Sequence, residues 1–95
     1  MTLNWEPYNT DWLIKIAEEQ IPEEKEIINS LKKIKKGSWE SRAYVHFVDP
    51  SNPNQPNSKW QFEINICLTD KKNGEVVLDI LKGKIVGGVE FLKYL

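Results

Sequence analysis

Apolar residues alternate with polar ones in two stretches of the chain, on either side of a proline-rich segment. In residues 39–48 the alternate positions that form one stripe are Trp39, Ser41, Ala43, Val45 and Phe47. In residues 60–70 the corresponding stripe is Trp60, Phe62, Ile64, Ile66 and Leu68. Successive side chains of a strand point to opposite faces, so each stretch predicts a β-strand with one buried and one polar face. Residues 49–58, DPSNPNQPNS, predict a surface loop between the two strands.

Two more strands are predicted in residues 75–81 and 84–92. Their expected inward-facing positions are Val76, Leu78, Ile80, Ile85, Gly87 and Val89. A three-residue loop that ends at Gly74, with this glycine in the left-handed conformation, aligns Leu68 with Leu78 and keeps the apolar faces together.

A two-residue turn at Lys82–Gly83 is expected to join these last two strands and to pair Ile80 with Ile85. The Gly87–Gly88 pair interrupts the last strand. Glycines inside a strand indicate a β-bulge or the close approach of another backbone.

The N-terminal part of the chain predicts two helices. Thr10 is expected to cap a first helix over residues 11–20, whose apolar side chains recur at helical spacing. Pro22 can begin a second helix, because a proline in the first turn removes no hydrogen bond that the helix needs. Gly37 is expected to end this helix in a left-handed conformation. The buried stripe of the second helix is Ile27, Ile28, Leu31 and Ile34.

Four lysines gather at the end of the second helix: Lys32, Lys33, Lys35 and Lys36. Their charges complement the negative end of the helix dipole. Because the whole chain has a net charge of −1, this explanation is favoured over a phosphate-binding patch.

These elements predict an α+β fold with the order ααββββ. Two N-terminal helices pack on one face of a four-stranded antiparallel meander sheet, and residues 1–95 form a single domain. The outer face of the sheet is then free of helices. Its expected polar positions are Glu40, Arg42, Tyr44, His46, Gln61, Glu63, Asn65, Cys67, Thr69, Asp79 and Glu90.

The outer face also has an apolar half, formed by Val77, Leu81, Val86 and Leu92. Clustered aliphatic side chains on an open sheet face predict that something covers them. The alternatives are the N-terminal arm through Leu3, Trp5 and Tyr8, a second copy of the chain, or another protein.

Composition and motifs exclude most kinds of chemistry. The single cysteine, Cys67, allows no intramolecular disulfide, and the chain begins without a signal-peptide pattern or a membrane span, so we expect a cytoplasmic protein. The His and Cys content and the carboxylate spacing match no metal site, and no glycine-rich phosphate loop is present, so we expect no metal and no cofactor. The near-neutral charge argues against nucleic-acid binding.

One acid–base pair is a catalytic alternative. His46 is the only histidine, and it could lie across the sheet from Glu63 and relay protons. A lone strand histidine is more typical of a polar surface, and Cys67 is expected too far from it to form a nucleophilic pair. The sequence therefore favours a non-catalytic protein over an enzyme.

The sequence thus predicts a small protein-binding module, of an inhibitor, immunity or adaptor type, that acts through the outer sheet face. The expected partner is another protein or a second copy of the chain, because Tyr and Arg are common interface anchors. The expected binding residues are Arg42, Tyr44, His46, Glu63, Asn65 and Leu81. Two alternatives stay open: a homodimer, formed across that face or at the edge of the 84–92 strand, that holds a small ligand, and a weak binder of single-stranded nucleic acid.

Overall fold

The computed structural model describes residues 4–49 and 61–95 of the protein. Its elements, in chain order, are β1 (Glu6–Pro7), α1 (Asp11–Gln20), α2 (Lys25–Lys33), β2 (Lys36–Ser41), β3 (Tyr44–His46), β4 (Phe62–Asp70), β5 (Gly74–Leu81), β6 (Ile85–Phe91) and the 3₁₀ turn η1 (Leu92–Tyr94). The described strands form one antiparallel sheet in the order β1-β2-β3-β6-β5-β4.

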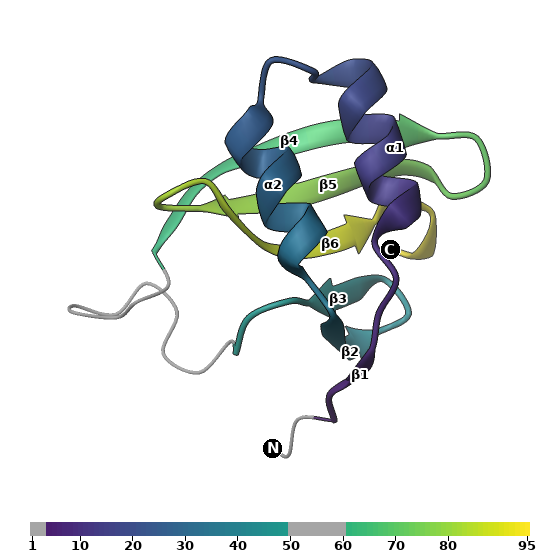
Figure 1. The fold of residues 1–95 in the computed structure, drawn as a ribbon. Coiled ribbons are helices and arrows are strands. Elements are labelled where there is room, and N and C mark those ends of the chain that lie inside the picture. Colours follow the sequence, from purple (N-terminus) through teal and green to yellow (C-terminus); the bar gives the residue numbers. More distant parts are fainter. Residues whose placement is uncertain (1–3, 50–60) are drawn as a thin grey trace.

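Helices α1 and α2 lie side by side on one face of this sheet (Figure 1). The α+β class and the two helices are therefore confirmed, whereas the sheet has six strands rather than the four predicted. Residues 50–58 of the predicted loop over 49–58, together with Trp60 and Leu3, lie outside the described residues. Within the described ranges no helix is long and apolar enough to cross a membrane.

Helix α1 has the bounds that the sequence predicts, and Thr10 stands at its N-cap position, but the Thr10 side chain makes no capping hydrogen bond. The side chain of Asn9 accepts a hydrogen bond from the backbone N–H of Asp11 at 2.8 Å. The hydroxyl of Thr10 turns away from the helix and donates to the carbonyl of Leu31, 2.8 Å away, at the end of α2. Thr10 is buried and so ties the start of one helix to the end of the other.

Helix α2 begins and ends at other residues than predicted. Pro22 lies in a turn and the helix starts at Lys25. At its end Ile34 adopts an extended conformation, and Gly37 lies in β2 opposite Glu6 rather than in a left-handed cap. A Cβ atom at Gly37 would come within 2.8 Å of the Val45 side chain, so close packing in the sheet explains this glycine.

The stretch 39–48 is a tight hairpin and not one long strand. The chain reverses at Arg42–Ala43, where the hydroxyl of Ser41 accepts a hydrogen bond from the backbone N–H of Ala43. A register irregularity between Trp39 and Ser41 precedes the turn. Alternation alone does not reveal such a turn, because a serine side chain replaces the usual Gly, Pro or Asn signal.

The meander order is also wrong, because β3 pairs with β6 and not with β4. Strand β6 therefore lies inside the sheet, and β4 is at its edge. Alternating apolar residues decide which face of a strand is buried, but they do not decide which strand lies next to it.

Both turns differ from the predicted register, and only the first keeps the predicted faces. Gly74 has a φ of 73°, as predicted, but the three-residue loop is 71–73, and Leu68 faces Val76 rather than Leu78. The last turn holds three residues, 82–84, and pairs Leu81 with Ile85. The shift at the first turn is two residues and leaves every side chain on its original face, whereas the shift at the last turn is one residue and exchanges the faces of Ile85 and Val86.

The Gly87–Gly88 pair marks a bulge, as the sequence indicates. Ile80 faces Val86 and Asp79 faces Gly88, so Gly87 is the extra residue. Between the turn and this bulge the faces of β6 are the reverse of those predicted, so Val86 joins the buried core instead of the outer face, and beyond the bulge Val89 faces inward as predicted.

The core is one layer between the helices and the sheet. Across the sheet it follows a row of paired residues, in which Val45 faces Val89, Val89 faces Leu78, and Leu78 faces Ile66. The helices cover this row with side chains that are almost fully buried: Leu13, Ile16, Ala17, Ile27, Ile28 and Leu31. The predicted stripes of both helices are thus confirmed as core.

Two aromatic residues that were predicted as core are exposed. Trp39 stays on the helix side, stacked on Phe91 with ring centroids 5.7 Å apart, yet it is 41% exposed. Phe62 precedes an irregularity in β4 and pairs with Leu81; it is 45% exposed. Phe47 does pack against the core, beside Tyr8 of the N-terminal arm at 5.1 Å.

The free edge of β4 is held by the last residue of α1. The side-chain amide of Gln20 donates to the carbonyl of Thr69 at 2.6 Å and accepts from the N–H of Thr69 at 3.0 Å. It thus takes the place of a neighbouring strand at this point of the edge. An occupied edge position is protected from pairing with other chains.

We predict that two aliphatic residues of β4 differ in their contribution to stability. Leu68→Ala removes a buried side chain and should reduce the free energy of unfolding by about 2–5 kcal/mol. Ile64→Ala, at a position that is 43% exposed, should reduce it by less than about 1 kcal/mol. Urea denaturation followed by tryptophan fluorescence measures both values, and an equal or larger loss for Ile64→Ala would contradict the observed packing.

We also predict that Gln20 protects the β4 edge. Gln20→Ala should accelerate hydrogen exchange of the Thr69 amide and reduce stability by about 0.5–1.5 kcal/mol. Gln20→Glu keeps an acceptor for that amide but loses the donor to the carbonyl, so it should give an intermediate rate. NMR-detected exchange tests the order, and identical rates in all three proteins would rule out the clamp.

Candidate functional site

Two rows of paired residues cross the face of the sheet that the helices leave open. In the first, Tyr44 faces Glu90, Glu90 faces Val77, and Val77 faces Cys67. On each strand, the residues of both rows are direct sequence neighbours of the core row through Val45. Because neighbouring side chains of a strand point to opposite faces, the side chains of both rows lie on the outer face.

The second row places His46 opposite Gly88, Gly88 opposite Asp79, and Asp79 opposite Asn65. It runs beside the first, and the rings of His46 and Tyr44 lie 4.6 Å apart. Of the six predicted binding residues, the paired register thus places Tyr44, His46 and Asn65 on the outer face.

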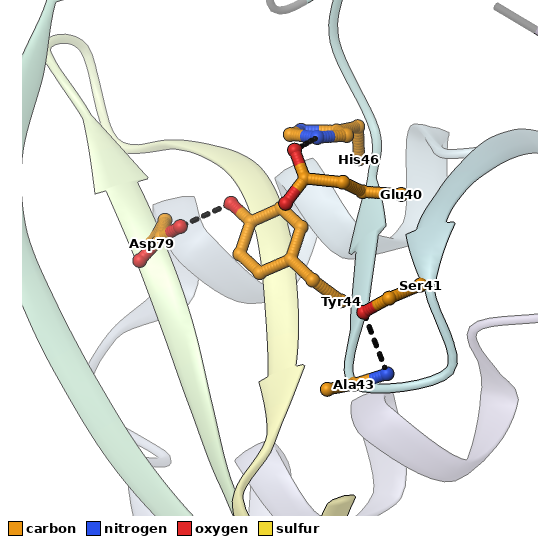
Figure 2. A network of polar contacts seen from close by, with 6 residues as sticks. All are labelled: Glu40, Ser41, Ala43, Tyr44, His46 and Asp79. Atoms are coloured by element: carbon orange, nitrogen blue, oxygen red, sulfur yellow. Dashed lines mark hydrogen bonds and ion pairs between the residues drawn. The ribbon is translucent and has the colours of Figure 1, made fainter. Parts of the chain in front are cut away.

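Tyr44 occupies the space that Gly88 leaves empty. A Cβ atom at position 88 would come within 2.9 Å of the Tyr44 ring and within 2.8 Å of the backbone carbonyl of Val45. The ring therefore lies down across β6 and reaches β5, where its hydroxyl donates a hydrogen bond to the carboxylate of Asp79 (Figure 2). Packing and this bond hold the ring in one orientation.

Three carboxylates surround the Tyr44 phenol: Asp79, Glu40 and Glu90. Burial of the phenol raises its pKa well above the ordinary value, and the hydrogen bond to Asp79 and the three negative charges raise the pKa further. All of these effects disfavour the phenolate. Tyr44 thus stays a neutral hydrogen-bond donor in an acidic environment.

His46 pairs with a carboxylate, but not with the one predicted. Its Nε2 lies 3.1 Å from Oε1 of Glu40, and the two side chains point toward each other in Figure 2. Glu63 belongs to β4, three strands away from β3, or about 14 Å at the usual strand spacing. The proposed proton relay between His46 and Glu63 is therefore wrong, and Cys67 is also on the distant β4.

Arg42 leaves the outer face because it lies in the β2–β3 turn. Its guanidinium carbon is 5.1 Å from the centre of the Tyr94 ring, and Lys93 approaches the same ring at 5.0 Å. This arrangement is a cation–π contact at one end of the sheet, beside the exposed Trp39. The outer face consequently lacks the cation that the sequence predicted for it.

Leu81 and Glu63 also have other surroundings than expected. Leu81 is only 8% exposed and packs over Gly87, where an added Cβ would lie 2.9 Å from its Cδ1. Glu63 is exposed at the irregularity of β4. Leu81 is thus buried and Val86 lies in the core, so of these predicted apolar residues only Val77 lies in the rows described above.

The N-terminal arm does not cover this face within the described residues. Its strand β1 pairs with β2, and Tyr8 packs against Phe47 and Trp39 on the helix side. The outer face around Tyr44 is therefore a polar, acidic surface with no element of the described chain over it (Figure 1).

The polar side chains around Tyr44 have hydrogen-bond partners within the chain. The Tyr44 hydroxyl is already bonded to Asp79, and His46 is already paired with Glu40. Among the described residues no buried side-chain nitrogen or oxygen lacks a hydrogen-bond partner, and no three His, Cys, Asp or Glu side chains are grouped to hold a metal ion. A network whose members are all hydrogen-bonded fixes the orientation of its side chains.

Sequence reasoning placed Glu40, Asp79 and Glu90 on the outer face but gave them no role. Their importance depends on the pairing of β3 with β6, which brings Tyr44 to Asp79 across β6. The Gly87–Gly88 pair is the sequence feature that could have indicated the site, because Gly88 leaves space for a large side chain to lie across the sheet.

Comparisons with protein-family models, with curated proteins and with solved structures found no match for this chain.

We predict that Tyr44 makes the protein less stable at alkaline pH. Above about pH 10 a tyrosine ionises in the unfolded chain, whereas the raised pKa keeps Tyr44 protonated in the folded protein. The unfolded state then binds fewer protons, so stability is fully present below this pH and falls as pH rises above it.

In Tyr44→Phe this loss of stability at alkaline pH should be smaller. Some loss should remain, because burial also raises the pKa of Tyr8. At neutral pH the same variant should lose about 1–3 kcal/mol, because Asp79 loses its donor. Urea denaturation at pH 7, 9, 10 and 11 measures both effects. A stability profile above pH 10 that is as steep in Tyr44→Phe as in the wild type would contradict the prediction.

Proposed function

We propose that the protein is a small non-catalytic protein-binding module, and that its outer face binds a partner with a basic surface. The observation that carries this proposal is the acidic surround of Tyr44 on an open sheet face. Its hydroxyl is bonded to Asp79, Glu90 is its paired residue on β6, and Glu40 lies beside its ring. Tyrosine is enriched among the residues that dominate binding energy. Carboxylates around it favour positively charged partners and accelerate their association.

The fixed geometry of the site supports this function. Tyr44 is held by Gly88 and Asp79, and His46 is held by Glu40, so few rotamers remain to be ordered when a partner binds. Side-chain ordering at an interface costs about 0.5–1.5 kcal/mol per residue, and a preorganised face avoids part of that cost. A face of this kind suits an inhibitor or immunity-type protein that covers a basic site on its target.

The same charges weigh against the two alternatives at this face. A second copy would bring equal carboxylates into opposition, and like charges across an interface are unfavourable. Pairing through the edge of the 84–92 strand is wrong, because β6 lies inside the sheet. Nucleic-acid phosphates would likewise be repelled by Asp79, Glu40 and Glu90.

The test compares two variants with the same change in net charge. The first, Glu40→Lys/Glu90→Lys, reverses the acidic face; the control, Glu19→Lys/Glu23→Lys, reverses two exposed glutamates near the helices. Each protein is immobilised and exposed to lysate of the source organism, and retained proteins are identified by mass spectrometry. We expect a basic protein that the wild type and the control retain and the first variant loses.

Purification of that partner then allows its affinity to be measured by calorimetry. Tyr44→Ala should weaken binding at least about tenfold, with a stronger salt dependence of the association rate in the wild type than in the face variant. A partner that binds the face variant and the wild type equally, or that only the control fails to bind, would refute the proposal.

A further inference from the structure

A cleft of about 690 Å³ lies beside α2, on a different part of the molecule from the acidic face. It is bordered by the C-terminal half of α2, the turn between β5 and β6, and the residues that follow β3. Apolar residues contribute to its lining: Trp5, Ile34, Phe47, Val48, Ile85 and Val86. Trp5 is 38% exposed, which leaves its ring accessible to a bound molecule.

The charged residues of this cleft are mostly lysines. Lys33, Lys35, Lys36 and Lys84 line it, against one carboxylate, Glu26, which gives the lining a formal charge of +3. The whole chain has a net charge of −1, so positive charge is concentrated here.

Lys84 comes from the β5–β6 turn and joins the other lysines only through the fold. It also has an ion pair, with Glu24 at 3.9 Å, and Lys32 has one with Glu18 at 4.0 Å. Among the described residues, no carboxylate lies within ion-pair distance of Lys33 or Lys35. The dipole of α2 explains lysines at its own end, but it does not explain one from a distant turn.

We propose that this cleft binds a small organic anion, with an acidic group carried on a flat apolar body. The lysines provide the charge for a carboxylate, sulfonate or phosphate group. Trp5 and Phe47 provide aromatic surface for the apolar body. The volume is within the range of about 300–1,000 Å³ that small-molecule sites occupy. This site is separate from the acidic face, so either proposal can fail without the other.

The test uses two fluorescent probes that differ only in an anionic sulfonate group: 8-anilinonaphthalene-1-sulfonate and its neutral analogue N-phenyl-1-naphthylamine. The wild-type protein is titrated with each at low ionic strength. We expect the sulfonate to bind at least about tenfold more tightly than the neutral probe. In the ¹⁵N NMR spectrum it should shift the amides of Ser30, Gly83 and Ile85, which border the cleft.

Charge reversal then locates the binding. Lys33→Glu/Lys84→Glu should weaken binding of the sulfonate by about tenfold. The control Lys15→Glu/Lys71→Glu makes the same charge change at exposed positions outside the cleft, and it should change this affinity by less than about twofold. Lys33→Glu alone, which breaks no described ion pair, should give an intermediate loss if the double variant proves unstable. Equal affinity for both probes, equal effects of the two double variants, or amide shifts confined to other regions would overturn the proposal.

Discussion

The pairing of β3 with β6 is the constraint on which the rest of the structure depends. It places Val45 opposite Val89 in the middle of the core row, with the helices above it. The pairing requires Gly88, because any side chain there would collide with the carbonyl of Val45. Since β3 is only three residues long, this short contact attaches the whole β1–β2–β3 part of the sheet to the β6–β5–β4 part.

The same pairing produces the candidate site on the opposite face. The gap above Gly88 accepts the Tyr44 ring, and the ring then reaches Asp79 on the far side of β6. The carboxylates of Glu40 and Glu90 are brought to the phenol from β2 and from β6. One glycine therefore determines both a contact of the core and the acidic surface on the outside.

The near-neutral net charge conceals two regions of opposite sign. Carboxylates gather around Tyr44 on the outer face, and lysines gather in the cleft beside α2. A balanced composition gives only the average charge of the surface, whereas the local electrostatic potential depends on which charged residues the fold brings together. For this reason a net charge of −1 does not distinguish a uniformly mixed surface from one with separate acidic and basic regions.

Periodicity in the sequence determined the helix α1, the buried stripe of α2 and the inward faces of Ile66, Leu68, Val76 and Leu78. These features depend on spacing along the chain, which burial of one face imposes directly. The hairpin at Ser41, the exchange of faces at Gly87 and the neighbour of β3 were decided only by the tertiary structure. A period of two assigns each side chain to a face, but the choice between strands with similar apolar faces depends on how all of them pack together under the helices. The ion pair of His46 with Glu40, instead of Glu63, follows from that choice.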